Sequence, residues 1–275
     1  MRLIDGLFTT FVRSPFYPYA LFFRNEKNTR DLLKAYGAGL AVDIGCGSSN
    51  FRQFCLSDTG IRSYVGLDYP AWLGNLSRGD GIADKSGFVR RLLRHRPVQP
   101  DVWGDGCRLP MGDGCVDTTL SLGVLEHVPD YERYVSEVGR VLKEGGHLVM
   151  SIPFLYQAHG GVDERDDFAR WTKAGITGLL KKHDLAVVEV RSYGGVGTTL
   201  AQLVNSYAIK KCKVYDARWF VLKCAVLCAC LPLFFVANVA GALLDTFDRD
   251  PAYACGFQIV ARRTPSNFTH EAATS

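Results

Sequence analysis

Three aspartates in this chain lie at the ends of successive apolar segments. Asp43 lies just before a glycine-containing turn at 45–47, Asp68 comes 25 residues later, and Asp105 follows a third apolar segment. Glycines in such a turn let the backbone approach a ligand without an intervening Cβ, and the N–H groups of the following helix can bind it. An aspartate at the end of the next strand is placed to accept hydrogen bonds from both hydroxyls of a ribose. The pattern therefore predicts a site for a ribose-containing ligand.

The glycine turn departs from the dinucleotide fingerprint GxGxxG. Asn50 stands where the third glycine would be, and that glycine lets the helix pack closely on the strand beside a bound pyrophosphate. A nicotinamide-dependent reductase is therefore disfavoured, and the shorter turn suits a ligand that lacks a pyrophosphate.

A second group of residues could supply a general base. His159 and Asp167 lie in a charged segment, 153–172, that follows an apolar strand-like run. In open α/β sheets, ligands bind beyond the carboxyl ends of such strands. We expect His159 to be the base and Asp167 to orient either His159 or the substrate. His127, in the motif LEHV, is a further candidate, and its alternative role is to cap the next helix or fix its loop.

Alternating strand and helix patterns surround these residues. Short apolar runs bounded by turn residues predict strands, and segments with one apolar face predict helices. Because the two alternate, we expect a parallel sheet covered by helices on both sides. The expected strands are 40–44, 64–67, 98–103, 118–125, 147–153, 185–190 and 256–261, and the expected helices include 25–36, 131–142 and 173–183.

Five motifs in order carry a family resemblance. VDIGCG, GLDY, GDGCRLP, LEHV and LKEGGHL occur in this order between about residues 40 and 190. With them the chain resembles the class I S-adenosylmethionine-dependent methyltransferases. The resemblance implies a doubly wound, Rossmann-like α/β fold with a mostly parallel seven-stranded sheet and an antiparallel last strand. It also implies S-adenosyl-L-methionine as the cofactor.

The resemblance assigns roles to residues of these motifs. Asp43 would orient the ammonium group of the cofactor directly or through water, and Asp68 would hold the ribose. Asp105 would bond the adenine amino group. The residues implied to surround the methionine part and the sulfonium are Asp43, Gly45, Cys46, Gly47, Ser121 and Leu122, and those implied to face the adenine are Tyr69, Asp105, Gly106 and Cys107.

An uncharged apolar run at 224–244 is long enough to cross a bilayer. A last strand follows it, and in the family fold this strand returns to the same sheet, so a single crossing is excluded. We expect Pro232 and Asn238 to break the run into two pieces. The predicted organisation is an aromatic arm with a helix at 1–38, a cofactor-binding core at 39–193, an apolar helical insertion at 194–253, the last strand at 254–263 and a polar tail at 264–275.

The insertion has three possible roles: a re-entrant or interfacial membrane contact through 219–244, a cap on the substrate pocket, or a homodimer surface. Basic residues flank the apolar run, as is typical of segments that face the cytoplasmic leaflet. They are Lys210, Lys211, Lys213, Arg218 and Lys223. The flank favours the membrane contact.

Amino-acid composition excludes several other classes of protein. With 47% hydrophobic and 22% charged residues the chain is too apolar for a disordered protein and too mixed for a polytopic membrane protein. The net charge of +4 comes without a lysine-rich arm, so a nucleic-acid partner is not expected. The nine cysteines are scattered, which predicts no metal site and favours a reducing compartment. No secretory signal opens the sequence, so we expect a cytoplasmic protein, attached or not to the inner face of the membrane.

The resulting functional prediction is methyl transfer to a hydroxyl of a sugar, a lipid-linked compound or another hydrophobic metabolite. A small-molecule or lipid-linked acceptor fits the apolar insertion and the aromatic arm, which would both flank the pocket. One alternative is C-methylation of a quinone-like ring, with a histidine ionising a phenol. Another is a scaffold subunit that binds the cofactor without catalysis.

Overall fold

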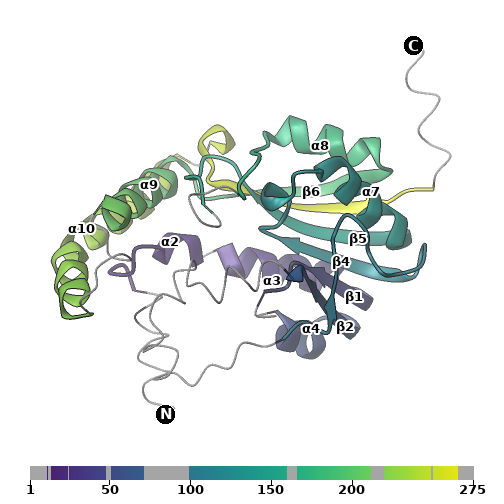
Figure 1. Ribbon diagram of the computed structural model, residues 1–275. Coiled ribbons are helices and arrows are strands. Elements are labelled where there is room, and N and C mark those ends of the chain that lie inside the picture. The colour runs from purple at the N-terminus through teal and green to yellow at the C-terminus, as the bar shows by residue number, and fades with distance from the viewer. Residues whose placement is uncertain are drawn as a thin grey trace.

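A single seven-stranded sheet forms the centre of the computed structural model (Figure 1). The structure describes residues 11, 14–23, 25–47, 51–70, 99–159, 166–211, 220–248 and 250–265. The strands are β1 (Ala38–Ile44), β2 (Gly60–Asp68), β3 (Val102–Trp103), β4 (Val116–Leu122), β5 (Leu142–Pro153), β6 (Leu185–Tyr193) and β7 (Gly256–Arg263). Their spatial order is β3-β2-β1-β4-β5-β7-β6.

The strand directions confirm the expected doubly wound topology. β1 pairs in parallel with β2 and β4, β2 with β3, and β4 with β5. β7 lies between β5 and β6 and is antiparallel to both. The last strand therefore returns to the sheet, and its Gly256 pairs with Pro153 on one side and Tyr193 on the other.

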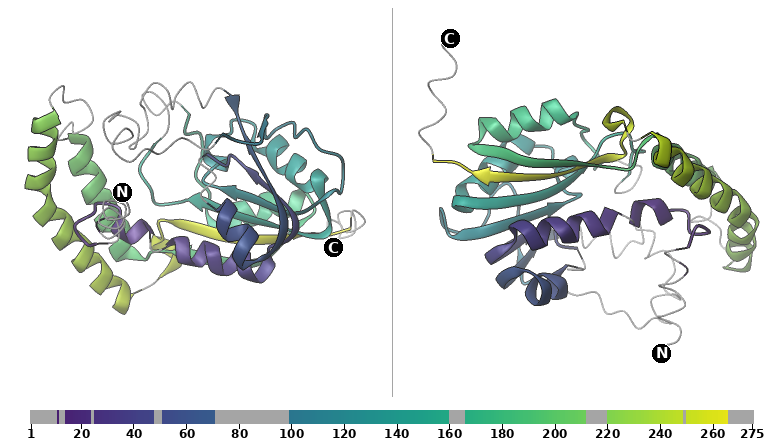
Figure 2. Two further views of the ribbon diagram at one scale, coloured as in Figure 1. Left: turned by 90° about the horizontal axis from the view of Figure 1, so that it is seen from below. Right: turned by 180° about the vertical axis from the view of Figure 1, so that it is seen from behind.

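Helices cover both faces of the sheet, as Figures 1 and 2 show. One face carries α3 (Asn25–Tyr36) and α4 (Arg52–Asp58), and the other carries α7 (Tyr131–Val141) and α8 (Lys173–Lys182). The central strands are buried on both sides because both sides are covered. One core cluster includes Leu33, Ala41 and Phe54, and the second packs α7 and α8 against the sheet.

Local sequence signals explain where the covering helices begin. Asp130 caps α7, since its side chain accepts a hydrogen bond from the Arg133 N–H, and Thr172 caps α8 through the Gly175 N–H. A short polar side chain before an apolar-faced segment is the usual helix start. The expected helix at 25–36 coincides with α3, and the expected helix at 131–142 ends one residue earlier because Leu142 begins β5.

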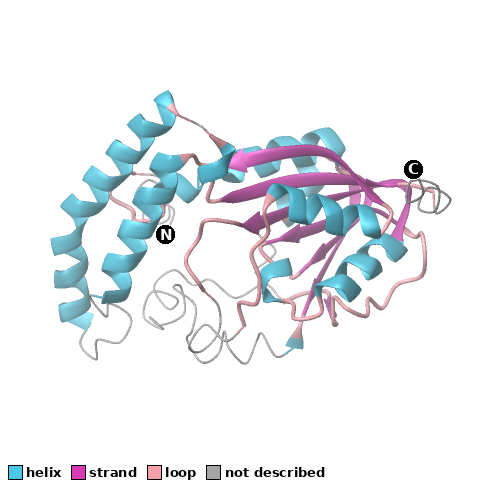
Figure 3. Ribbon diagram, turned by 90° about the horizontal axis from the view of Figure 1, so that it is seen from above, coloured by secondary structure: helices cyan, strands magenta, loops and turns pink. Residues whose placement is uncertain are grey.

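A helical hairpin lies between β6 and β7 in the chain. It consists of α9 (Val196–Lys211) and α10 (Phe220–Phe247), which pack side by side next to the sheet rather than over it (Figures 1 and 3). Since α9 follows β6, the hairpin begins at the edge where the parallel strands end. By length and composition alone the segment Cys228–Phe247 could cross a membrane. In its most apolar stretch of 18 residues, 22% of the residues are buried.

The expected break at Pro232 and Asn238 is wrong, because α10 runs through both residues. Pro232 is exposed and removes one backbone hydrogen bond, a loss that packing along α9 can offset. The buried Asn238 side chain turns outward from its own helix to the N-terminal segment, donating to Pro15 O at 2.7 Å and to Tyr17 O at 2.8 Å. This asparagine fastens the N-terminal arm to the hairpin instead of ending a helix.

The two helices of the hairpin approach most closely at a pair of glycines. A Cβ added to Gly241 would lie 2.5 Å from the Gly197 carbonyl oxygen. Asp245, one turn further along α10, accepts hydrogen bonds from the N–H groups of Gly197 and Thr198 at the start of α9. The hairpin is therefore a specifically packed unit and not two loosely associated helices.

We predict that Gly241→Ala destabilises the protein although alanine is the better helix former. Overpacking against the Gly197 carbonyl should lower the free energy of unfolding by about 1–3 kcal/mol. The matched control is Gly178→Ala in α8, where an added Cβ meets nothing within 4 Å. That control should gain about 0.5–1 kcal/mol. Urea denaturation of both variants tests the pair, and equal stabilisation by both would contradict the close packing.

Candidate functional site

Two adjoining cavities open at the carboxyl ends of the parallel strands. The first has a volume of about 540 Å³ and lies over β1, β2 and β4; the second, of about 620 Å³, lies over β4 and β5 and beside β6 and β7. Gly123, the residue directly after β4, lines both cavities. A ligand in one cavity can therefore meet a ligand in the other at this residue.

The glycine turn at 45–47 lies beside the first cavity, which Gly45 lines. Gly45 and Gly47 have φ angles of +72° and +52°, values that L side chains rarely adopt. The N–H groups of Gly45 and Cys46 donate to Leu67 O at 2.8 and 3.1 Å, which fixes the turn on β2. A Cβ on Gly45 would also lie 2.5 Å from Val124. Both the backbone conformation and the space require glycine here.

Asp68 links the glycine turn to the end of β2. Its carboxylate accepts hydrogen bonds from the Gly47 N–H and from the Tyr69 N–H, each at 2.8 Å. Burial raises the pKa of Asp68 above its ordinary value, while these two hydrogen bonds oppose the shift. Asp68 and Tyr69 both line the first cavity, as expected for a ribose acceptor and its neighbour.

The segment after β3 supplies the opposite wall. Asp105, Gly106 and Cys107 all line the first cavity, and the Asp105 carboxylate accepts a hydrogen bond from the Cys107 N–H at 2.8 Å. Burial, followed by the negative charge of Asp105, raises the pKa of Cys107 to about 11. Cys107 is therefore a neutral thiol at pH 7.

Asp43 and Ser121 lie beneath the cavities and do not line either. Asp43 is buried under the glycine turn and accepts a hydrogen bond from the Tyr64 hydroxyl. Burial raises the pKa of Asp43 to about 7, although the Tyr64 hydrogen bond opposes the shift. Ser121 is fully buried and shares a 2.7 Å hydrogen bond with the Tyr134 hydroxyl. Leu122, the next residue, lines the second cavity.

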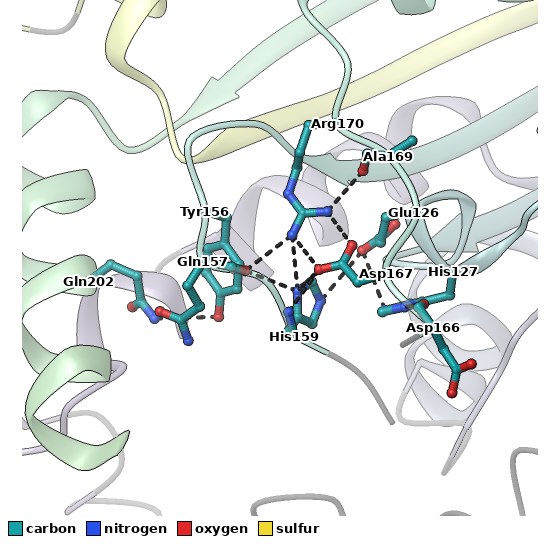
Figure 4. A network of polar contacts seen from close by, with 10 residues as sticks. All are labelled: Glu126, His127, Tyr156, Gln157, His159, Asp166, Asp167, Ala169, Arg170 and Gln202. Carbon is teal, nitrogen blue, oxygen red and sulfur yellow. Dashed lines mark hydrogen bonds and ion pairs between the residues drawn. The ribbon is translucent and has the colours of Figure 1, made fainter. Parts of the chain in front are cut away.

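The second cavity contains the expected base. His159 lines it together with Tyr156 and Leu122. The backbone N–H of His159 donates to Asp167 Oδ2 at 2.8 Å, and Nδ1 of the His159 ring lies 3.3 Å from the same oxygen. Asp167 is in turn held by the guanidinium of Arg170, with Nη2 2.6 Å from Oδ2 (Figure 4). The structure thus brings His159 and Asp167 together, as the sequence analysis predicts.

Electrostatics suit His159 to a role as a base. Burial and the nearby His127 ring lower the pKa of His159, while the charge of Asp167 raises it. Burial raises the pKa of Asp167, but the hydrogen bonds from Arg170 and from the His159 N–H outweigh this and lower the pKa overall. At pH 7 the pair therefore consists of a neutral imidazole and an ionised carboxylate.

His127 stands beside His159 rather than capping a helix. The two rings meet edge to face with centroids 4.9 Å apart. Nδ1 of His127 lies 2.6 Å from Asp166 O, and Asp130 is the cap of α7. Of the two alternative structural roles, fixing the loop agrees with these contacts and capping does not.

Glu126 is a candidate that the sequence analysis does not contain. It lies in the short 3-10 helix η1 (Leu125–His127), is only 2% exposed, and has Oε1 3.8 Å from Nε2 of His159. Burial raises its pKa to about 7. The sequence signal that could have identified Glu126 is its position, since it is an acid next to a histidine shortly after a strand.

We predict that the buried Asp43 makes the stability of the protein depend on pH. The folded protein holds the Asp43 proton up to about pH 7, whereas the unfolded chain releases it near its ordinary value of 3.8. The free energy of unfolding should therefore fall as the pH rises between these values. Asp43→Asn removes this loss and should raise the free energy of unfolding at pH 8 by on the order of 2–4 kcal/mol, with much less effect at pH 4.

Asp117→Asn is the matched control for this prediction. Burial raises the pKa of Asp117, but hydrogen bonds from Lys143 Nζ and the Leu40 N–H outweigh it, and the pKa is lowered overall. This substitution should destabilise the protein at pH 8. Chemical denaturation at both pH values measures the two effects, and a destabilised Asp43→Asn variant at pH 8 contradicts the assigned pKa.

Comparisons with known proteins agree with the fold. A family model described as a methyltransferase domain matches residues 42–150. An uncharacterized methyltransferase of Mycobacterium leprae is 32% identical over 123 residues, which cover 44% of this chain and 40% of that protein. The chain thus spans less than half the length of this relative.

Two further comparisons extend over most of the chain. A protein of Mycolicibacterium smegmatis named as a probable S-adenosylmethionine-dependent methyltransferase is 27% identical, over 81% of this chain and 75% of its own length. The solved structure of phosphoethanolamine N-methyltransferase 2 of Haemonchus contortus, in complex with phosphomonomethylethanolamine and S-adenosylhomocysteine, has a TM-score of 0.50 at 14% identity. The match covers 93% of this chain and 60% of that chain, and it shows the fold. In its methyltransferase-domain match at 42–150 and its mixed seven-stranded sheet, the chain is similar to the class I S-adenosylmethionine-dependent methyltransferases.

Proposed function

We propose that this protein transfers the methyl group of S-adenosyl-L-methionine to a hydroxyl of a hydrophobic or lipid-linked metabolite. The observation that carries the proposal is the meeting of the two cavities at Gly123. The first cavity has the carboxylates and glycine turn that suit the cofactor, and the second has a neutral histidine beside an ionised carboxylate. Two binding sites that share one wall residue are the arrangement that direct group transfer requires.

The residues of the first cavity fit an adenosine with an attached amino acid. Asp68 and Asp105 offer carboxylate oxygens to hydroxyl and amino donors, and Ile44, Leu67 and Tyr134 offer apolar surface. When bound, the cofactor supplies a methyl group on a sulfonium, which is already a good leaving group. The main task of this chain is therefore to hold the acceptor in line and to exclude water.

Accepting the proton of a hydroxyl is the one chemical step that a side chain must perform. Nδ1 of His159 lies 3.3 Å from the Asp167 carboxylate and 3.3 Å from the Gln157 carbonyl, and Nη2 of Arg170, a donor, lies 3.4 Å from it. We place the proton of the neutral ring on Nδ1, because two acceptors face this nitrogen at the shorter distance. Nε2 then carries the lone pair that can accept the hydroxyl proton. Asp167 would stabilise the imidazolium that forms, and Arg170 holds Asp167 in place.

The hairpin gives the acceptor site an apolar neighbour. Gln202 of α9 donates to the hydroxyl of Tyr156 at 3.4 Å, so the hairpin touches a wall of the second cavity (Figure 4). Large apolar side chains on both of its helices are exposed: Leu200, Leu203, Val204, Tyr207, Leu233, Phe235, Val236, Val239, Leu243, Leu244 and Phe247. We refer to these eleven residues as the apolar face of the hairpin.

We propose that the apolar face rests on the inner leaflet of a membrane. Exposed surface of this extent marks an interaction site in a soluble fold. Lys210 and Lys211, at the end of α9, are exposed and could contact anionic headgroups. Lys213, Arg218 and the segment 212–219 of the expected contact lie outside the described residues. A membrane contact here would bring a lipid-linked acceptor to the second cavity.

We predict that His159→Gln lowers turnover while leaving cofactor binding nearly unchanged. Loss of a general base costs about 10²- to 10⁴-fold in turnover, whereas His159 does not line the first cavity. The measurement uses a labelled methyl donor with lipid and water-soluble cell extracts, and calorimetry with S-adenosylhomocysteine. His183→Gln is the control, because His183 pairs with Glu132 away from both cavities. Full turnover by His159→Gln would refute its role as the base, and product in the water-soluble fraction alone would refute a lipid-linked acceptor.

We predict that the full-length protein floats with vesicles of phosphatidylcholine and phosphatidylglycerol. Val236→Glu combined with Leu243→Glu places two charges on the apolar face and should abolish flotation, because each charge would have to leave water. Val188→Glu in β6, at an exposed valine outside the hairpin, should float like the unaltered protein. If the unaltered protein stays in the dense fraction, the apolar face is instead a cap or dimer surface, which sedimentation velocity distinguishes.

A further inference from the structure

Three potential metal ligands converge where the two cavities meet. Oε1 of Glu126 lies 3.8 Å from Nε2 of His159 and 4.0 Å from Nε2 of His127, and the three ligand atoms all lie within 4.8 Å of one another (Figure 4). His127 lines the first cavity, and Glu126 and His159 line the second. We propose that Glu126, His127 and His159 bind one divalent transition-metal ion of the zinc type.

Hydrogen bonds orient both imidazoles for ligation through Nε2. The Nδ1 of His127 is 2.6 Å from the carbonyl oxygen of Asp166, which can only accept, so the proton lies on Nδ1. Nδ1 of His159 faces two acceptors, Gln157 O and the Asp167 carboxylate, at 3.3 Å and one donor, Nη2 of Arg170, at 3.4 Å, so we place its proton on Nδ1 as well. Metal-bound histidines commonly donate their second N–H to a carbonyl or carboxylate, which fixes the ring and the tautomer. Each Nε2 therefore carries a lone pair, as a metal ligand requires.

Within the described residues, Glu126 is a buried acid whose ion-pair partners are the two histidines and no lysine or arginine. Its side chain is 2% exposed, and its Oε2 has no hydrogen-bond partner within the part of the chain that the structure describes. The nearby guanidinium of Arg170 is bound to Asp167 by both of its terminal nitrogens. An ionised carboxylate in such a place is costly unless it is paired or binds a metal. A divalent ion would supply the missing positive charge.

The donor set determines the class of ion. Two imidazole nitrogens and one carboxylate oxygen, with a position left open, form the ligand set of several catalytic zinc sites. Magnesium and calcium prefer oxygen ligands throughout. With bonds of about 2.0–2.1 Å, tetrahedral ligands lie roughly 3.4 Å apart, so the two carboxylate-to-imidazole distances would have to shorten by about half an ångström. Side-chain rotation can provide a change of this size.

The proposed binding of a metal ion does not depend on which acceptor the protein methylates. The role of that ion in the reaction, however, rests on the proposed function. A bound ion would occupy the Nε2 lone pair of His159, so this histidine is a ligand in the loaded protein and a base in the metal-free one. The open position would lie beside the second cavity, which Glu126 and His159 line. An acceptor hydroxyl placed there would become more acidic through contact with the ion.

Cobalt binding to the chelator-treated full-length protein tests the inference. Co²⁺ alone should bind with a stoichiometry of one, giving visible d–d absorption without the strong near-ultraviolet band of cobalt–thiolate bonds. This spectrum separates the site from the free cysteines, among which Cys228 is exposed. Glu126→Gln and His159→Gln should each lower the affinity for Co²⁺ by at least about 10- to 100-fold. A loss of this size is found even for residues that only hydrogen-bond to a metal ligand.

His183→Gln is the matched control. His183 also pairs with a glutamate, but among the described residues it belongs to no group of three potential metal ligands. It should bind Co²⁺ like the unaltered protein. Circular dichroism and S-adenosylhomocysteine binding show that each variant is folded. The inference is overturned if the unaltered protein does not bind Co²⁺ saturably, if the thiolate band appears, or if Glu126→Gln binds Co²⁺ with undiminished affinity. Failure to bind S-adenosylhomocysteine would instead count against the proposed function, whatever the cobalt result.

Discussion

The insertion of β7 between β5 and β6 is the constraint on which the arrangement of the site depends. Because this strand is antiparallel and pairs on both sides, the chain after β6 must leave the sheet and come back to the same edge. The hairpin α9–α10 is the excursion that results, and its apolar face cannot be a single membrane crossing. The same return holds α9 against Tyr156, so the topology of the sheet decides what surrounds the second cavity.

Buried carboxylates give the site its chemical character and lower the stability of the protein without its ligands. Asp43 lies under the glycine turn and Glu126 under the two histidines, and burial raises the pKa of each to about 7. A positive partner would lower both pKa values and recover part of the ionisation cost. For Asp43 that partner would be the ammonium of the cofactor, and for Glu126 it would be a metal ion. Two binding events would thus be coupled to stability by the same electrostatic effect.

Asp167 and Arg170 form the opposite kind of pair, in which charge is fully matched. The guanidinium holds both carboxylate oxygens, and the remaining contacts of Asp167 go to His159. Such a pair fixes a geometry and contributes little net stability. The pair positions His159, whereas Glu126, in η1 after β4, keeps its carboxylate available to a cation.

The sequence by itself determined the α/β class, most strand and helix positions and several of the residues that line the first cavity. Those residues, Asp68 and Asp105 among them, lie within short motifs at strand ends, and parallel strands bring their carboxyl ends to one edge. Tertiary structure alone decided that Asn238 lies inside one continuous α10 and reaches the N-terminal arm, because its partners Pro15 and Tyr17 are more than 200 residues away. It also decided that Glu126 and His127 meet His159. Ligand clusters of this kind come from separate loops, and no local spacing records the distance between side chains that only the packed sheet brings together.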